Sequence, residues 1–401
     1  MKISKLQLVY LAALSMLGFI ATDMYLPAFK VMEVDFATGP EHIALSLTVF
    51  LVGMAFGQLI WGLASDKFGH RNTLAAGLAL FTVASFGLAF SEQVWQLLTL
   101  RFVQAIGVCA PAVIWQAMVI KRYSSQSQQI FATIMPLVAL SPALAPQLGV
   151  LLADNFGWHS IFVTLTLMGV LLVVATMTQK DETPEIKQTS MSTDIKALLG
   201  SKTYLGNVLM FATASAAFFA YLTGMPEIMS QLGYQAKDIG LSFIPQTIAF
   251  MVGGYFGKVG VRKYGDAKVL LQLIGLFSVA ALLIFVASQW HLTSIWPILA
   301  PFCLIAVANG ALYPIVVNRA LASAKQSPAT AAGLQNSLQI TVSSLASALV
   351  AAMASQAQLV TGIAIVICMS GLWIGYILSN RELAKHFTPP DNARVVSEED
   401  M

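Results

Sequence analysis

The feature that most constrains this chain is a succession of apolar blocks, each 18 to 27 residues long, separated by short polar segments. About 20 predominantly apolar residues are enough for a helix to cross the hydrocarbon core of a bilayer. Hydrophobic residues make up 57% of the 401 positions and charged residues only 10%, which is not the composition of a soluble protein. We therefore predict an all-α membrane protein with twelve transmembrane helices. The expected spans lie near 7–30, 42–65, 72–91, 95–120, 128–153, 159–179, 203–230, 239–260, 268–289, 295–318, 328–354 and 358–379.

The distribution of Lys and Arg predicts how these spans are oriented. If the N-terminus is cytoplasmic, the 22 Lys and Arg residues fall on the cytoplasmic side except Lys30, Lys237 and Arg101, the last of which lies within a span. Such an excess is typical of cytoplasmic loops. We therefore expect both termini in the cytoplasm. The net charge of +3 reflects this loop bias and gives no indication of nucleic-acid binding.

The sequence divides into two similar halves of six expected helices. A constant shift of 196 positions aligns Tyr25 with Tyr221 and Gly69 with Gly265, without a gap over some sixty residues. Parallel repeats of this kind build transporters whose site lies between two pseudo-symmetric six-helix bundles near the middle of the membrane. We predict an N-terminal bundle over 1–180, a cytoplasmic linker over 181–202, a C-terminal bundle over 203–380 and a cytoplasmic tail over 381–401.

Two charged residues are expected deep in the membrane. Asp23 lies inside the first apolar block and Arg101 at a similar depth in the fourth. A charge in the membrane costs roughly 2.5–3.5 kcal/mol on insertion scales and often marks an ion or substrate path. Asp23 is thus a candidate titratable centre. The alternatives are a carboxylate near the membrane edge or a structural Asp23–Arg101 ion pair without a transport role.

The loop after the second span, Gly62–Arg71, is a candidate gate. Gly62 and Gly69 permit a tight turn, and Asp66 and Arg71 place charges where the halves would meet. The eleventh span opens with Ser327-Pro328 on the same side of the membrane. The Asp66 carboxylate could therefore lie against the N-terminus of that helix, where negative charge is favourable. A solvated basic loop, or local pairing of Asp66 with Arg71, is the alternative.

The remaining polar and aromatic residues within spans are candidates for substrate binding. Amides beside aromatic rings suit a flat, neutral ligand that forms hydrogen bonds. Each residue taken singly could instead join one helix to another. The candidates are Tyr25, Gln104, Trp115, Gln116, Phe218, Tyr221, Gln246, Asn309, Tyr313, Gln335, Asn336 and Gln339.

Four stretches of the sequence resemble the major facilitator superfamily, and within it the Bcr/CflA branch of drug/proton antiporters. They are Thr22–Pro27, Gly62–Arg71, Arg101–Gln104 and Ser141–Gly149. The resemblance implies a protein of the bacterial inner membrane in which Asp23 is the proton site and Arg101 its coupling partner. It also implies that Asp66 and Arg71 form the gate between inward-open and outward-open states. The energy source would be the proton gradient, with no cofactor.

Three stretches, Arg101–Gln116, Gly240–Gly254 and Ala308–Val317, are similar to the purine-nucleoside transporter of that branch. We therefore expect a monomeric, proton-coupled transporter of purine nucleosides or similar flat neutral molecules. The alternative is a multispecific drug/proton antiporter. We do not expect an enzyme, because the sequence shows no metal-ligand spacing, serine–histidine arrangement or phosphate loop. The expected partners are protons, a small-molecule substrate and the lipid bilayer.

Overall fold

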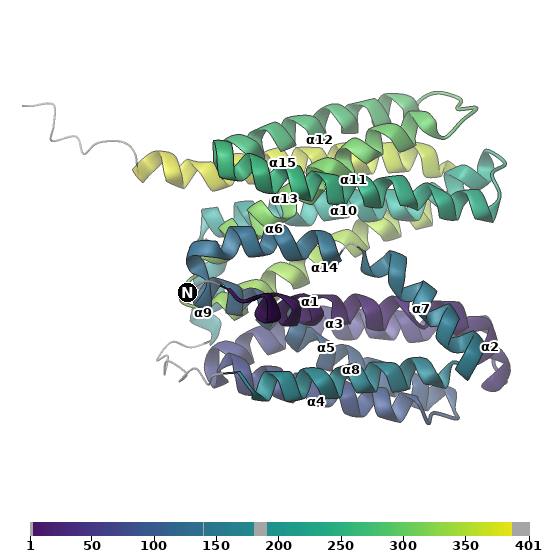
Figure 1. Cartoon of the computed structure of the whole chain (residues 1–401). Coiled ribbons are helices and arrows are strands. Elements are labelled where there is room, and N and C mark those ends of the chain that lie inside the picture. The colour runs from purple at the N-terminus through teal and green to yellow at the C-terminus, as the bar shows by residue number, and fades with distance from the viewer. Residues whose placement is uncertain (1–2, 139, 180–190, 387–401) are drawn as a thin grey trace, which may run out of the picture.

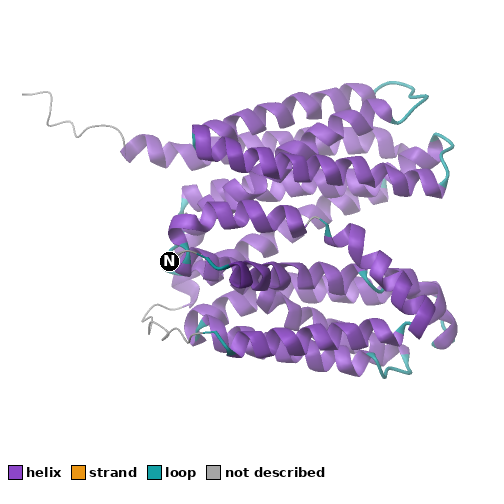
Figure 2. Ribbon diagram, viewed as in Figure 1, coloured by secondary structure: helices purple, strands orange, loops and turns teal. Residues whose placement is uncertain are grey.

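The computed structural model describes residues 3–138, 140–179 and 191–386, which are almost entirely helical. Figure 2 shows helices joined by short loops, and no strand occurs among these residues. The helices of the first half are α1 (Lys5–Asp23), α2 (Phe29–Asp35), α3 (Pro40–Phe68), α4 (His70–Leu88), α5 (Val94–Arg122), α6 (Ser127–Val138), α7 (Ser141–Phe156) and α8 (His159–Met177). They are followed by α9 (Met191–Gly200), α10 (Lys202–Gln231), α11 (Ala236–Tyr264), α12 (Asp266–Ser288), α13 (Trp296–Ser323), α14 (Pro328–Ala352) and α15 (Ala357–His386).

Every expected span corresponds to one of these helices or to a consecutive pair of them. The first span was expected to be one helix, but it breaks after Asp23 into α1, a 3-10 turn over Leu26–Ala28 and α2. The fifth span likewise divides into α6 and α7. In both cases a proline stands at the start of the second piece, where its missing N–H is tolerated. Among the described residues, nine helical segments have the length and hydropathy of a membrane span.

The two halves of the chain form two bundles that lie side by side (Figure 1). Helices α1–α5, α7 and α8 make up one group and α10–α13 and α15 the other. Between them lie α6, which belongs to the first half of the chain, and α14, which belongs to the second. The first group contains a large apolar core, with Leu14 and Phe81 fully buried, which extends to residues of α10, α13 and α14. The second group contains another, with Ile274 and Phe277 fully buried. The exact limits of the bundles stay a prediction. Residues 181–190 of the expected linker and 387–401 of the tail lie outside the described part.

The predicted repeat is confirmed at the turns that follow α3 and α11. Both helices are 29 residues long, and each ends at a glycine that also begins the next helix. Gly69 has φ 87° and Gly265 has φ 80°, a region that costs little only for glycine. The same turn therefore recurs 196 positions along the chain.

The end of the molecule where α3, α5 and α11 finish is called the basic end here. It carries the N-terminus, as Figure 1 shows. Its positive residues include Lys67, Arg71, Lys121, Arg122, Lys258, Arg262 and Lys263.

Candidate functional site

Arg101 lies at the centre of a closely packed cluster in the first bundle. Its side chain is fully buried, and the guanidinium carbon lies 4.0 Å from the ring centroids of both Tyr25 and Phe50. Its Nη1 donates to the carbonyl oxygen of Ala21 at 3.1 Å and to Oε1 of Gln104 at 2.6 Å. Each cation–π contact contributes about 2 kcal/mol or more when it is shielded from water. Tyr25 in the turn after α1, Phe50 of α3 and Arg101 of α5 therefore hold three segments together.

The guanidinium keeps unused hydrogen-bonding capacity. Its Nε and Nη2 are buried and have no hydrogen-bond partner. Asp23, the last residue of α1, is partly buried, and no ion pair joins it to Arg101 in this structure. This structure therefore does not contain the structural Asp23–Arg101 ion pair that was one of the alternatives from the sequence. A buried donor without a partner costs roughly 1–3 kcal/mol, and more when it is charged, so an acceptor that reached Arg101 would be strongly held.

The polar neighbours of Arg101 are occupied by one another. Nε2 of Gln104 donates to Oγ of Ser85 at 2.8 Å, and the Tyr25 hydroxyl lies 3.0 Å from Oγ of Ser46. Tyr25 and Gln104 were predicted to bind substrate, and here all their hydrogen bonds go to protein groups. Phe50, Ser46 and Ser85 were missed, because apolar helices contain many such residues and nothing in their spacing distinguishes them.

In the second bundle, Tyr221 stacks on Phe302 with ring centroids 3.3 Å apart and an interplanar angle of 4°. The ring of Phe218, which is only partly buried, has its centroid 6.2 Å from that of Phe302. The Tyr221 ring is fully buried and its hydroxyl has no hydrogen-bond partner. This bundle thus contains an aromatic pair with an unused hydroxyl.

Three predicted amide residues of the second bundle also have unused hydrogen-bonding groups. Asn309 donates through Nδ2 to the Ala214 carbonyl at 3.3 Å, but its Oδ1 has no partner. Oε1 of Gln246 and both polar atoms of the Gln335 amide are also buried without partners. Buried polar groups are usually satisfied by protein, water or ligand. These amides are therefore the best-supported candidates for contact with a substrate.

The other predicted residues take part in packing within or between the bundles, although Oε1 of Gln116 is also buried without a partner. Nε2 of Gln116 donates to Oδ1 of Asn336 at 3.4 Å across the two bundles, and Gln339 donates to Oγ of Ser215 at 2.5 Å. Trp115 packs edge-on against Phe131 with ring centroids 5.3 Å apart. Tyr313 packs similarly against Phe211 at 5.1 Å. A binding role for these residues stays a prediction.

The predicted contact between Asp66 and the start of α14 is confirmed. Its Oδ2 accepts from the backbone N–H of Thr330 at 2.7 Å and its Oδ1 from that of Ala329 at 3.3 Å. Negative charge is favourable at a helix N-terminus because the first backbone N–H groups have no partner within the helix. The expected loop over Gly62–Arg71 is wrong in extent, because α3 continues to Phe68 and includes Gly62 and Asp66. Only Gly69 forms the turn, and Arg71 lies in the first turn of α4.

Two glycines bring α3 and α14 into backbone contact beside Asp66. A Cβ on Gly62 would lie 2.5 Å from the Ala329 carbonyl oxygen, and one on Gly333 would lie 2.5 Å from that of Gln58. Any larger residue would therefore force the helices apart. Further along, Oγ of Ser337 donates to the Ala55 carbonyl at 3.2 Å. The two bundles are thus in direct contact along α3 and α14 at the basic end.

Comparisons with known proteins agree with this architecture. A family model described as Major Facilitator Superfamily matches residues 11–351. A bicyclomycin resistance protein homolog of Haemophilus influenzae is 27% identical over 342 residues, which are 82% of this chain and 83% of that protein. A chloramphenicol resistance protein of Pseudomonas aeruginosa is 29% identical over 322 residues, which are 78% of this chain and 75% of that protein.

Solved structures share the fold over nearly the whole length. The transporter FucP, crystallised in an outward conformation, superimposes with a TM-score of 0.73 at 14% identity, over 94% of this chain and 99% of that one. The proton:xylose symporter XylE gives a TM-score of 0.69 at 16% identity, over 94% and 98%. With two helical bundles, a match over most of the sequence and a shared fold, the chain belongs to the major facilitator superfamily and is a multi-pass membrane transporter, not an enzyme.

Proposed function

We propose that this protein is a proton-coupled exporter of drug-like organic molecules, of the Bcr/CflA branch, in a bacterial inner membrane. The names of the two relatives, which refer to resistance to bicyclomycin and chloramphenicol, support export of antibiotics over the nucleoside transport expected from the sequence. Neither of these names refers to nucleosides, although three stretches of the sequence resemble a nucleoside transporter.

The observation that carries the coupling proposal is the pair of unused donors on Arg101. Asp23 is partly buried, and the sequence predicts that it lies at a similar depth in the membrane to Arg101. The two residues are not paired in this structure. Ionised Asp23 would be stabilised by Nε and Nη2 of Arg101 in a second conformation, whereas protonated Asp23 would not need them. Proton binding and release would then follow the conformational state, as coupled transport requires. No cofactor enters this scheme.

The substrate would be an uncharged molecule with an aromatic ring and several hydrogen-bonding groups. The unsatisfied atoms of Gln246, Asn309 and Gln335 suit such a molecule, and chloramphenicol is one. A purine nucleoside is the second candidate, because a flat base presents donors and acceptors that match the same amides. None of the candidate substrate-binding residues of the second bundle is an aspartate or a glutamate. The absence of an acid among them favours neutral substrates over cations.

We also propose that the basic end faces the cytoplasm and that Asp66 helps to close it. The excess of Lys and Arg at this end supports that orientation. The hydrogen bonds from Ala329 and Thr330 to Asp66 would then hold the cytoplasmic ends of the bundles together. Opening this end would require both bonds to break.

Transport by purified protein in liposomes tests these proposals. Counterflow should be measured with chloramphenicol, adenosine, inosine and a lipophilic cation, each with and without a pH gradient. We expect chloramphenicol to be exchanged and to be accumulated against its gradient only when a pH gradient is imposed. Exchange of nucleosides without chloramphenicol would favour the second candidate. Accumulation that does not depend on pH would contradict proton coupling.

A further inference from the structure

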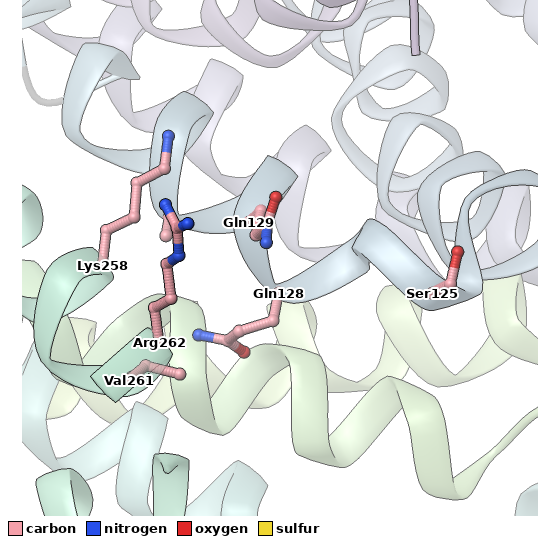
Figure 3. A pocket seen from close by; sticks show the side chains of 7 residues that line it. Ser125, Gln128, Gln129, Lys258, Val261 and Arg262 are labelled. Atoms are coloured by element: carbon pink, nitrogen blue, oxygen red, sulfur yellow. The ribbon is translucent and has the colours of Figure 1, made fainter. Parts of the chain in front are cut away.

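A small cavity lies between the two bundles at the basic end, away from the Arg101 cluster and the unpartnered amides. Its volume is about 170 Å³, and it is bounded by η2 (Ser124–Gln126) and α6 of one bundle and by α11 of the other. Figure 3 shows Ser125, Gln128 and Gln129 on one side, with Lys258 and Arg262 of α11 on the other. The bundles also touch beside it, because a Cβ on Gly254 would lie 2.4 Å from Cγ of Pro136.

The charges around this cavity favour an anion. Lys258 and Arg262 are positive, and no acidic residue is among the side chains that line it. Within the described residues, Arg262 makes no hydrogen bond or ion pair, while Lys258 donates to Oγ1 of Thr133 on α6 at 2.7 Å. Oε1 of Gln128 is buried without a partner and could accept from a hydroxyl group. A guanidinium and an ammonium group beside one cavity are the usual binders of phosphate oxygens.

The surface of α11 indicates where the phosphate would come from. Ile244, Ile248, Tyr255 and Arg262 fall at i, i+4, i+11 and i+18, so they share one face of the helix. The three apolar members are exposed by 52%, 56% and 66%. Only 22% of the α11 span is buried inside the protein, the smallest share among the nine candidate spans. An exposed apolar face that leads to a cationic cavity at the membrane end fits acyl chains below a phosphate head group.

We propose that the cavity between α6 and α11 binds the head group of an anionic phospholipid, with the acyl chains along the exposed face of α11. Lys258 and Arg262 would bind the phosphate, and Gln128 a head-group hydroxyl. A zwitterionic lipid fits less well, because its ammonium group would find no acidic partner among the lining residues. Because the cavity is lined by both bundles, a bound lipid would stabilise the state in which the basic end is closed. This inference does not depend on the identity of the transported substrate.

Native mass spectrometry of the purified full-length protein tests the proposal. The probes are phosphatidylglycerol and phosphatidylethanolamine with identical acyl chains. We expect wild type to retain phosphatidylglycerol at least five-fold better than phosphatidylethanolamine, and Lys258→Gln/Arg262→Gln to lose this preference. The matched control is Lys263→Gln, which removes a charge next to Arg262 but does not line the cavity. Arg262→Lys keeps the charge and should retain most of the preference.

Two further measurements separate the possible outcomes. Phosphatidylglycerol should raise the melting temperature of wild type and Lys263→Gln but not of the double variant, and all three should melt alike without lipid. Equal retention of phosphatidylglycerol by wild type and the double variant would overturn the proposal. An equal loss in Lys263→Gln would also overturn it, because binding would then follow overall charge. Protection by inorganic phosphate as large as that by phosphatidylglycerol would overturn the assignment to a lipid.

Discussion

Tyr25 and Tyr221 occupy equivalent positions in the two repeats, yet their surroundings differ. Tyr25 lies against the guanidinium of Arg101, and its hydroxyl forms a hydrogen bond with Ser46. Tyr221 lies against the ring of Phe302, and its hydroxyl has no partner. One repeat thus places a charge beside its tyrosine where the other places an apolar ring.

The last turns of α3 and α11 differ in the same way. Asp66, in the last turn of α3, accepts two backbone hydrogen bonds from α14 of the second half. Arg262, its equivalent 196 positions later, lines the cavity toward α6 and forms no such bond within the described residues. The repeated backbone is therefore kept while its charges are not. We interpret the first bundle as the one that handles protons and the second as the one that supplies neutral contacts to the substrate.

Asp23→Asn should have the largest effect on this division. Without a titratable group, the variant should exchange substrate but lose accumulation driven by a pH gradient, by at least ten-fold in the liposome assay. Glu227→Gln is the control, because it removes an acid of α10 in the other bundle, and it should leave both activities intact. Full pH-driven accumulation by Asp23→Asn would remove Asp23 from the proton-coupling mechanism.

Asn309→Ala should weaken substrate binding by about 10- to 100-fold, which corresponds to roughly 1.4–2.8 kcal/mol. The reason is that its free Oδ1 would no longer be available to the ligand. Binding of chloramphenicol and adenosine to purified protein measures the effect, and Gln339→Ala, whose amide already donates to Ser215, serves as the comparison. If both variants bind as wild type does, the unpartnered Oδ1 of Asn309 is not a substrate contact.

Replacing each tyrosine by phenylalanine compares the two repeats directly. Tyr25→Phe removes the hydroxyl that bonds to Ser46 in a fully buried cluster, while Ser46 keeps its bond to the Ile43 carbonyl, so the free energy of unfolding should fall by about 0.5–1.5 kcal/mol. Tyr221→Phe removes a hydroxyl that has no partner, so the stability of the substrate-free protein should not fall. Thermal melting in detergent measures both. An equal loss of stability would show that the Tyr221 hydroxyl is satisfied after all.

Asp66→Asn should have the smallest effect. The amide keeps one acceptor but loses the charge at the start of α14, so closure of the basic end should weaken by about 0.3–2 kcal/mol. Double electron–electron resonance between labels on the basic-end loops of the two bundles would report a larger population of long distances. Lys67→Gln, next in sequence, is the control for loss of a charge. Unchanged distance distributions in Asp66→Asn would argue against a latch.

Several features of this protein could be predicted from the sequence because they depend on local chemistry. Apolar block lengths predicted the helical segments, and the repeated Gly69 and Gly265 predicted equivalent turns, since only glycine adopts that backbone conformation cheaply. The contact between Asp66 and α14 was also predictable. An acid near the end of one helix and the N-terminus of another helix on the same side of the membrane attract each other without detailed packing.

What only the tertiary structure decided is which buried side chains meet. Phe50, Ser46 and Ser85 surround the Arg101 cluster, and Phe302 stacks on Tyr221, although each looks like an ordinary residue of an apolar helix. The rotation of each helix about its axis determines these partners, and lipid-facing and protein-facing sides of a membrane helix are similarly apolar, so the pattern of residues does not specify it. For the same reason the unpaired state of Asp23 and Arg101, and the cavity between α6 and α11, could be found only once the helices were placed against one another.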